Sequence, residues 1–293
     1  ITEPEGKMNK AGRRPHPGAR ASAILLALFL AAGPALAQPQ AGPLAVQIFA
    51  HRGHHLTEPE NSLAALRAAM ELGLHGSEVD LRTTKDGQVV LMHDANLERT
   101  SDGQGPLAEH SLEQLRRYRL KFSSGQTSAE RIPTLEEALA LVKSRPGFRL
   151  VLDLKQVDPA QVARQVLRQG LAGQVVFFVA DPQDVAQART IQGAGPGLTL
   201  AVDLLTWWKI EGLPRFVVNA LGAKALFAAE WFFPRYGFAE AREAGAEVMV
   251  YLWGQDNLPQ RLDRAASLGA SVVSSDRPDL IINLARPRAA AGN

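Results

Sequence analysis

Residues 149–179 read RLVLDLKQVDPAQVARQVLRQGLAGQVVFFV. Two apolar runs in this segment, Arg149–Leu154 and Val175–Val179, have the length and composition of buried β-strands. Between them, Ala160–Gln169 has the periodicity of a helix. A strand, a helix and a second strand in this order predict two parallel strands joined by a right-handed crossover.

The same alternation extends along most of the chain. The expected strands are Val46–Ala50, Ser77–Leu81, Val89–Met92, Arg149–Leu154, Val175–Val179, Leu198–Val202, Ala225–Ala228, Glu247–Leu252 and Ser271–Ser274. The expected helices are Ser62–Leu72, Leu135–Lys143, Ala160–Gln169, Gln183–Ile191, Trp207–Leu221, Tyr236–Ala244 and Leu258–Leu268. So many strand and helix units predict an α/β protein with a closed (β/α)₈, or TIM, barrel.

One connection interrupts the alternation. Residues 94–133 fit no strand and helix unit; they contain Gly103, Gly105, Gly125, many charged residues and one short amphipathic piece, Leu112–Tyr118. We therefore expect a small insertion after the second strand, lying over one end of the barrel.

The first 37 residues have the pattern of an export signal. A basic region precedes the apolar run Ala21–Ala32, and Ala35–Ala37 forms an A-x-A cleavage motif. Twelve apolar residues are too few to cross a bilayer, which argues against the alternative of a stable membrane anchor. We expect translation to start at Met8, cleavage after Ala37, and a mature periplasmic or secreted chain. Residues 38–293 then number 293 − 37 = 256, close to the length of one TIM barrel.

Composition narrows the chemistry. The chain has 293 residues, of which 46% are hydrophobic and 21% charged, as in globular proteins, and it has no cysteine. Disulfides, zinc–thiolate sites, iron–sulfur clusters and cysteine nucleophiles are therefore excluded. The sequence pI of about 9.0 comes from the leader, because residues 1–37 hold five of the 32 basic and two of the 30 acidic residues. The remaining 27 basic and 28 acidic residues give a net charge of −1, so no nucleic-acid partner is implied.

Polar residues gather at the ends of the first strand units. His51 and Arg52 follow the first strand; Glu78 and Asp80 lie two apart on the second, so their side chains point to one face. His93 follows the return strand, and Asp153 and Lys155 close the next one. Each has an ordinary structural alternative, such as a solvated edge or an Asp153–Lys155 ion pair. Their gathering at the carboxyl ends of strands, where barrel enzymes place their active sites, favours a catalytic site.

These residue types suit the cleavage of a phosphodiester. Three carboxylates (Glu78, Asp80 and Asp153) suit one hard divalent cation, Mg²⁺ or Ca²⁺. Arg52 and Lys155 supply positive charge for a phosphate. His51 and His93 can exchange protons near neutral pH, one with the attacking hydroxyl and one with the leaving oxygen. In-line displacement at phosphorus needs both neutralisation of the phosphate charge and proton transfer at the attacking and leaving oxygens.

The motifs resemble those of the glycerophosphodiester phosphodiesterase family over nearly all of residues 38–293. They are IFAHRG (Ile48–Gly53), PENS (Pro59–Ser62), GSEVDLRTTKDGQVVLMHD (Gly76–Asp94), LERTSDGQG (Leu97–Gly105), IPTLEEAL (Ile132–Leu139), DLK (Asp153–Lys155), VYLW (Val250–Trp253) and SSDRPD (Ser274–Asp279). The resemblance implies a TIM barrel, a divalent metal, and hydrolysis of small glycerophosphodiesters to glycerol 3-phosphate and an alcohol.

The resemblance also implies a role for each site residue. His51 and His93 match the acid–base pair, Glu78 and Asp80 match metal ligands, and Arg52 and Lys155 match phosphate contacts. Glu60 matches a site-lining carboxylate that orients a neighbour, and Trp253 a wall of the substrate pocket. In the family scheme the 2-hydroxyl of the glycerol attacks phosphorus, so a cyclic phosphate precedes hydrolysis.

Two departures from the family pattern bear on the substrate. The third metal ligand is usually the Glu of an E-x-K motif, whereas this chain has the shorter Asp153, which either binds the metal directly or does so through a water. Aspartate there also resembles related phospholipase D-like toxins, so a phosphodiesterase acting on lysophospholipids or sphingolipids is the alternative. Trp253 is followed by Gly254-Gln255 where the family has Thr-Val, and it could be a plain core aromatic. A non-catalytic barrel that binds phosphate ligands is the second alternative.

Overall fold

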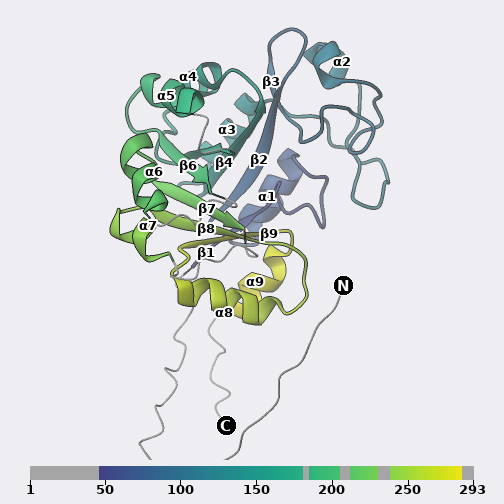
Figure 1. Ribbon diagram of the computed structural model, residues 1–293. Helices are drawn as coiled ribbons and strands as arrows, with labels where there is room; N and C mark the ends of the chain where they lie inside the picture. Colours follow the sequence, from purple (N-terminus) through teal and green to yellow (C-terminus); the bar gives the residue numbers. More distant parts are fainter. Residues whose placement is uncertain (1–45, 181–184, 205–211, 230–237, 286–293) are drawn as a thin grey trace, which may run out of the picture. The chain divides into compact units, whose positions relative to one another are not determined.

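The computed structural model describes residues 46–180, 185–204, 212–229 and 238–285. Eight strands in this part of the chain form a closed parallel barrel: β1 Gln47–Ala50, β2 Gly76–Thr83, β4 Arg149–Gln156, β5 Val175–Val179, β6 Thr199–Asp203, β7 Ala225–Ala229, β8 Glu247–Leu252 and β9 Val272–Ser275. They pair in the order β1-β9-β8-β7-β6-β5-β4-β2, and β2 closes the barrel on β1 (Figure 1). The predicted TIM barrel is confirmed.

Helices cover the barrel strands from outside, and all but the last of those described, α9, lie between two barrel strands in the sequence. They are α1 Leu63–Glu71, α3 Leu135–Lys143, α4 Pro159–Gln169, α5 Val185–Gly193, α6 Leu213–Leu221, α7 Ala239–Glu243, α8 Leu258–Leu268 and α9 Pro278–Ala285. Helix α4 shows how the sequence sets these bounds. Asp158 accepts a hydrogen bond from the Ala160 amide (2.9 Å), Pro159 occupies the first turn, and Gly170 ends the helix with a φ of 73°.

The predicted strands agree with the observed ones to within two residues at each end. Val89–Met92, predicted as a strand, contains β3 (Val89–Leu91), which pairs antiparallel with β2 and lies outside the barrel. Helix α9 was not predicted. Parts of the expected helices Gln183–Ile191, Trp207–Leu221 and Tyr236–Ala244, and all of the expected signal peptide, lie outside the described residues. No helix among the described residues is long and apolar enough to cross a membrane.

Within the described residues, the apolar core has three parts. The largest packs the outer faces of the barrel strands against the helices. A second fills the barrel interior with Phe49, Val151, Val176, Ala201, Ala225, Phe227, Met249 and Val272. The third belongs to the segment between β3 and α3, which carries the short helices η1 (Leu107–Glu109) and α2 (Leu112–Leu115), and consists of Val90, Met92, Leu97, Leu107, Leu115, Leu120 and Ile132. The predicted insertion after the second strand therefore has an apolar core of its own, beside the hairpin of β2 and β3 (Figure 1).

Candidate active site

The loop after β1 is fixed to the neighbouring strand β2. Arg52 and Gly53 both have positive φ, at 54° and 79°, which turns the chain sharply at the barrel rim. The Arg52 amide then donates to Glu78 Oε2 (3.0 Å), and the Gly53 amide donates to Ser77 Oγ (2.9 Å). Glycine is required at position 53, because a Cβ there would lie 2.4 Å from that of Ala65. The HRG motif thus places His51 and Arg52 directly above β2.

Three acidic residues converge beside this loop. Glu78 and Asp80 are buried on β2, Asp153 lies opposite Asp80 on β4, and carboxylate oxygens of all three lie within 4.8 Å of one another. Burial, together with the negative charges of Asp80 and Asp153, raises the pKa of Glu78 well above its ordinary value. Buried like charges repel unless a cation or proton joins them, and oxygen donors suit a hard divalent cation. The predicted carboxylate group therefore forms and fits such an ion.

Two basic side chains lie against these carboxylates. Lys155 Nζ is 2.6 Å from Asp153 and 3.4 Å from Asp80, and Arg52 Nε is 3.3 Å from Asp80 Oδ2 without hydrogen-bond alignment. Burial alone would lower the pKa of Lys155, but its ion pair with Asp153 raises it. Burial raises the pKa of Asp153, and the positive charge of Lys155 opposes that shift. The Asp153–Lys155 ion pair considered from the sequence is present, within the carboxylate cluster.

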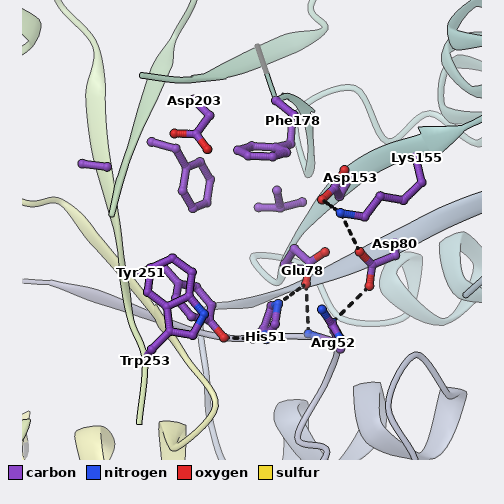
Figure 2. Close-up of a pocket in the computed structure, with 14 residues that line it drawn as sticks. His51, Arg52, Glu78, Asp80, Asp153, Lys155, Phe178, Asp203, Tyr251 and Trp253 are labelled. Carbon is purple, nitrogen blue, oxygen red and sulfur yellow. Dashed lines mark hydrogen bonds and ion pairs between the residues drawn. The ribbon is translucent and has the colours of Figure 1, made fainter. Parts of the chain in front are cut away.

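His51 is held between two acidic groups. Its Nε2 lies 3.7 Å from Glu78 Oε2 (Figure 2). Its Nδ1 lies 2.8 Å from Asp276 Oδ1. The Tyr251 hydroxyl donates to the same Asp276 oxygen (2.7 Å) and lies 2.5 Å from His51 Nδ1. Burial lowers the pKa of His51, although Asp276 opposes this. Asp276 therefore orients the imidazole and leaves Nε2 directed towards the carboxylate cluster.

His93 belongs to a separate set of ion pairs. Its Nδ1 lies 2.6 Å from Asp94 Oδ1, and Arg99 bridges Asp94 and Glu60 with contacts of 2.6 to 2.9 Å. Glu60 also accepts from Arg52 (3.1 Å). The hydrogen bond from Arg99 holds the pKa of Asp94 well below its usual range. Glu60 thus links the His93 network to the loop after β1.

A cavity of about 330 Å³ lies at the carboxyl ends of the barrel strands (Figure 2). Six predicted residues line it: His51, Arg52, Glu78, Asp80, Asp153 and Lys155; so does Trp253, whose ring centroid is 3.9 Å from that of Tyr251. His93 and Glu60 do not line it. The other lining residues are Val151, Phe178, Ala180, Asp203, Phe227, Ala228 and Tyr251.

Four residues that support the site were not singled out as such from the sequence: Asn61, Asp203, Tyr251 and Asp276. Two of them follow a simple pattern, because Asp203 and Tyr251 lie two positions after the interior residues Ala201 and Met249. Strand periodicity therefore directs both side chains into the barrel mouth. Asn61 and Ser62 of the PENS motif are both of residue types that cap helices. Ser62 caps α1, whereas Asn61 Nδ2 donates to Asp80 Oδ2 (2.8 Å) and its Oδ1 accepts from the Asp80 amide (3.0 Å).

Two further histidines, His54 and His55, directly follow the HRG motif. His54 is buried, and His55 Nε2 lies 3.1 Å from Asp276 Oδ1. His55 is therefore a second imidazole on the carboxylate that orients His51.

The fold and the cavity are those of a TIM barrel with its site at the carboxyl ends of the strands. Residues 51–280 match the glycerophosphoryl diester phosphodiesterase family, and the chain belongs to that family. A glycerophosphodiester phosphodiesterase of Caldanaerobacter subterraneus is 42% identical over 109 residues, which are 37% of this chain and 44% of that protein. The match thus spans less than half of that relative's length.

Solved structures agree in fold. The crystal structure of a glycerophosphodiester phosphodiesterase from Agrobacterium tumefaciens aligns with a TM-score of 0.70 and 26% identity, covering 81% of this chain and 99% of that one. A phosphodiesterase from Oleispira antarctica, in complex with the product sn-glycerol-3-phosphate, aligns with a TM-score of 0.68 and 24% identity, covering 81% and 96%.

Asn61→Gly is expected to lower the free energy of unfolding by about 1–3 kcal/mol, because the buried Asp80 carboxylate and amide each lose their hydrogen bond to Asn61. Glycine tolerates the φ of 55° at this position, so the decrease in the free energy of unfolding comes from the missing side chain and not from backbone strain. Urea denaturation of the purified variant measures it.

Asn257→Gly is the matched control. Asn257 also has positive φ (51°), but it is exposed and its side chain makes no capping hydrogen bond. We expect a change within about 0.5 kcal/mol there. Equal effects of the two substitutions would contradict the role given to Asn61.

Proposed function

We propose that this protein is an exported, metal-dependent glycerophosphodiester phosphodiesterase that releases glycerol 3-phosphate and an alcohol. One observation carries the proposal: a single cavity holds an oriented imidazole, two basic side chains and three converging carboxylates. The named relatives and the product complex of the Oleispira antarctica enzyme support the substrate class. A cavity of this size accommodates a small phosphodiester. The net charge of −1 on residues 38–293 does not favour a nucleic acid.

The phosphate would bind beside Arg52 and Lys155. Both side chains line the cavity. Their positive charges would attract the phosphate anion and so offset its repulsion by the adjacent carboxylates. Glu78, Asp80 and Asp153 would hold one divalent cation, Mg²⁺ or Ca²⁺, whose chemistry is to polarise the phosphoryl oxygens and neutralise developing charge. Asp153 would serve as the third ligand in place of the usual glutamate.

His51 and His93 would move the protons. As the 2-hydroxyl oxygen of the glycerol attacks phosphorus, its proton passes to one imidazole, and the other protonates the departing alkoxide of the headgroup alcohol. Water then opens the cyclic phosphate to glycerol 3-phosphate. Asp276 acts on His51 as a positioning residue, since it fixes the ring through Nδ1. Asp94 contacts Nδ1 of His93 in the same way.

Turnover of glycerophosphocholine by the purified protein tests the proposal. We expect metal-dependent glycerol 3-phosphate, lost with a chelator and restored by Mg²⁺ or Ca²⁺. Asp153→Asn should weaken cation binding measured by calorimetry, because one of the three carboxylate ligands is lost. Release of choline only from lysophospholipids would instead support the phospholipase D-like alternative, which Asp153 keeps open. Binding of substrate without turnover would support the non-catalytic alternative.

His51→Ala and His93→Ala should each lower kcat by about 10²–10⁴-fold, the usual contribution of general acid–base groups. Circular dichroism and thermal unfolding should match wild type, since both side chains are partly exposed. His110→Ala is the control: it removes a histidine of the insertion whose Nδ1 contacts only the Pro106 carbonyl among the described residues, and its activity should be unchanged. Activity within a few-fold of wild type in both site variants would contradict the mechanism.

Export is proposed from the sequence of residues 1–37 alone. When the gene is expressed from Met8 in a bacterium, the mature protein should appear in the periplasm or medium, because the A-x-A motif directs removal of the leader. N-terminal sequencing should then begin at Gln38. A protein that keeps Ala21–Ala32 would contradict this.

A further inference from the structure

Asp203 lies on the side of the cavity that the proposed phosphoryl chemistry does not use. It is the last residue of β6, it is buried, and it lines the cavity. In the barrel order, β6 is four strands from β1 in either direction, through β9, β8 and β7 or through β2, β4 and β5. Asp203 therefore lies across the barrel from His51 and Arg52, as Figure 2 shows.

Aromatic rings flank this carboxylate. Phe227 is the register partner of Asp203 on the adjacent strand β7, and Phe178 belongs to β5 on the other side of β6. The two phenyl rings contact edge to face, with centroids 4.8 Å apart and an interplanar angle of 79°. Tyr251 and Trp253, on and just after β8, continue the aromatic lining. Aromatic faces beside a carboxylate are the usual environment for a bound organic cation.

The charges of the lining residues divide the cavity into two halves. Arg52 and Lys155 belong to the half formed by β1, β2 and β4, together with the three carboxylates that would hold the cation in the proposed function. In the half formed by β5, β6 and β7, Asp203 is the one ionisable residue among the described lining residues. A carboxylate on that wall repels a phosphate anion and attracts a cation. The distribution matches a zwitterion with its phosphate at one end and an ammonium group at the other.

We propose that the wall formed by Phe178, Asp203 and Phe227 binds the ammonium headgroup of a cationic glycerophosphodiester of the choline or ethanolamine type. This inference rests on the proposed function, because it assumes that the phosphate binds beside Arg52 and Lys155. Asp203 provides the counter-charge, and the phenyl rings provide the apolar and cation–π contacts. The proposal assigns the headgroup, which the sequence motifs leave open.

The test compares two substrates that differ in headgroup charge: glycerophosphocholine, which is cationic there, and glycerophosphoglycerol, which is neutral. In Asp203→Asn we expect kcat/KM for glycerophosphocholine to fall roughly tenfold or more, since loss of a desolvated charge contact costs at least about 1.4 kcal/mol. The value for glycerophosphoglycerol should stay within about twofold. An equal loss on both substrates, or no loss on either, would overturn the proposal, because Asp203 would then bind the shared glycerol, act structurally, or not contact the substrate.

A second variant covers the case in which Asp203→Asn does not fold. Phe178→Leu keeps an apolar side chain but removes the ring, and it should also lower kcat/KM selectively for glycerophosphocholine. Equal effects on the two substrates would count against the proposal.

Calorimetric binding of both substrates separates this inference from the proposed function. A wild-type preference for glycerophosphocholine that Asp203→Asn removes, in a protein without turnover, would overturn only the enzyme activity. Turnover of both substrates without such a preference would overturn only the headgroup assignment.

Discussion

The site depends on the confinement of like charges. Glu78, Asp80 and Asp153 bring carboxylate oxygens within 4.8 Å of one another in a largely buried place, and water cannot screen their repulsion there. The positive charges of Lys155 and Arg52 and the amide of Arg52 offset part of that repulsion. The negative charge that remains makes the cluster suited to a divalent cation. The sharp turn at Arg52 and Gly53 and the two hydrogen bonds from Asn61 both serve this arrangement, because they hold its partners in place.

The barrel strands carry two layers of inward-facing side chains, an apolar layer that packs the interior and a layer above it that lines the cavity. Val151, Ala201 and Met249 belong to the apolar interior, and the residues two positions later, Asp153, Asp203 and Tyr251, face the cavity. Because strand side chains alternate, each strand contributes to the apolar layer below and to the site above. The site residues can therefore differ without altering the packing that closes the barrel.

The fold and the metal-ligand side of the site could be predicted from the sequence, because local patterns specify them. Glu78 and Asp80 share one strand face, and Asp153 lies on the next barrel strand opposite Asp80, so the order of the strands brings the three residues together. Asp276 could not be found this way: its contact with His51 spans 225 positions and exists only because β9 pairs with β1. The same closure places Tyr251 beside His51. Asp203 and Tyr251 could have been found from the sequence, because they lie two positions after interior residues on their strands and therefore face the same way. No local pattern distinguished Asn61 from the helix cap Ser62, since both residue types commonly cap helices.

The segment between β3 and α3 has an apolar core separate from that of the barrel, and His93 lies at its junction with β3. Small packing units of this kind open at a lower free energy than the main core. Under warming or mild denaturant, such opening would release the Asp94 and Arg99 contacts that hold His93 while the barrel stayed folded. In the proposed mechanism, activity would then be lost before the barrel unfolds, and a probe of global unfolding would overestimate the conditions under which turnover continues.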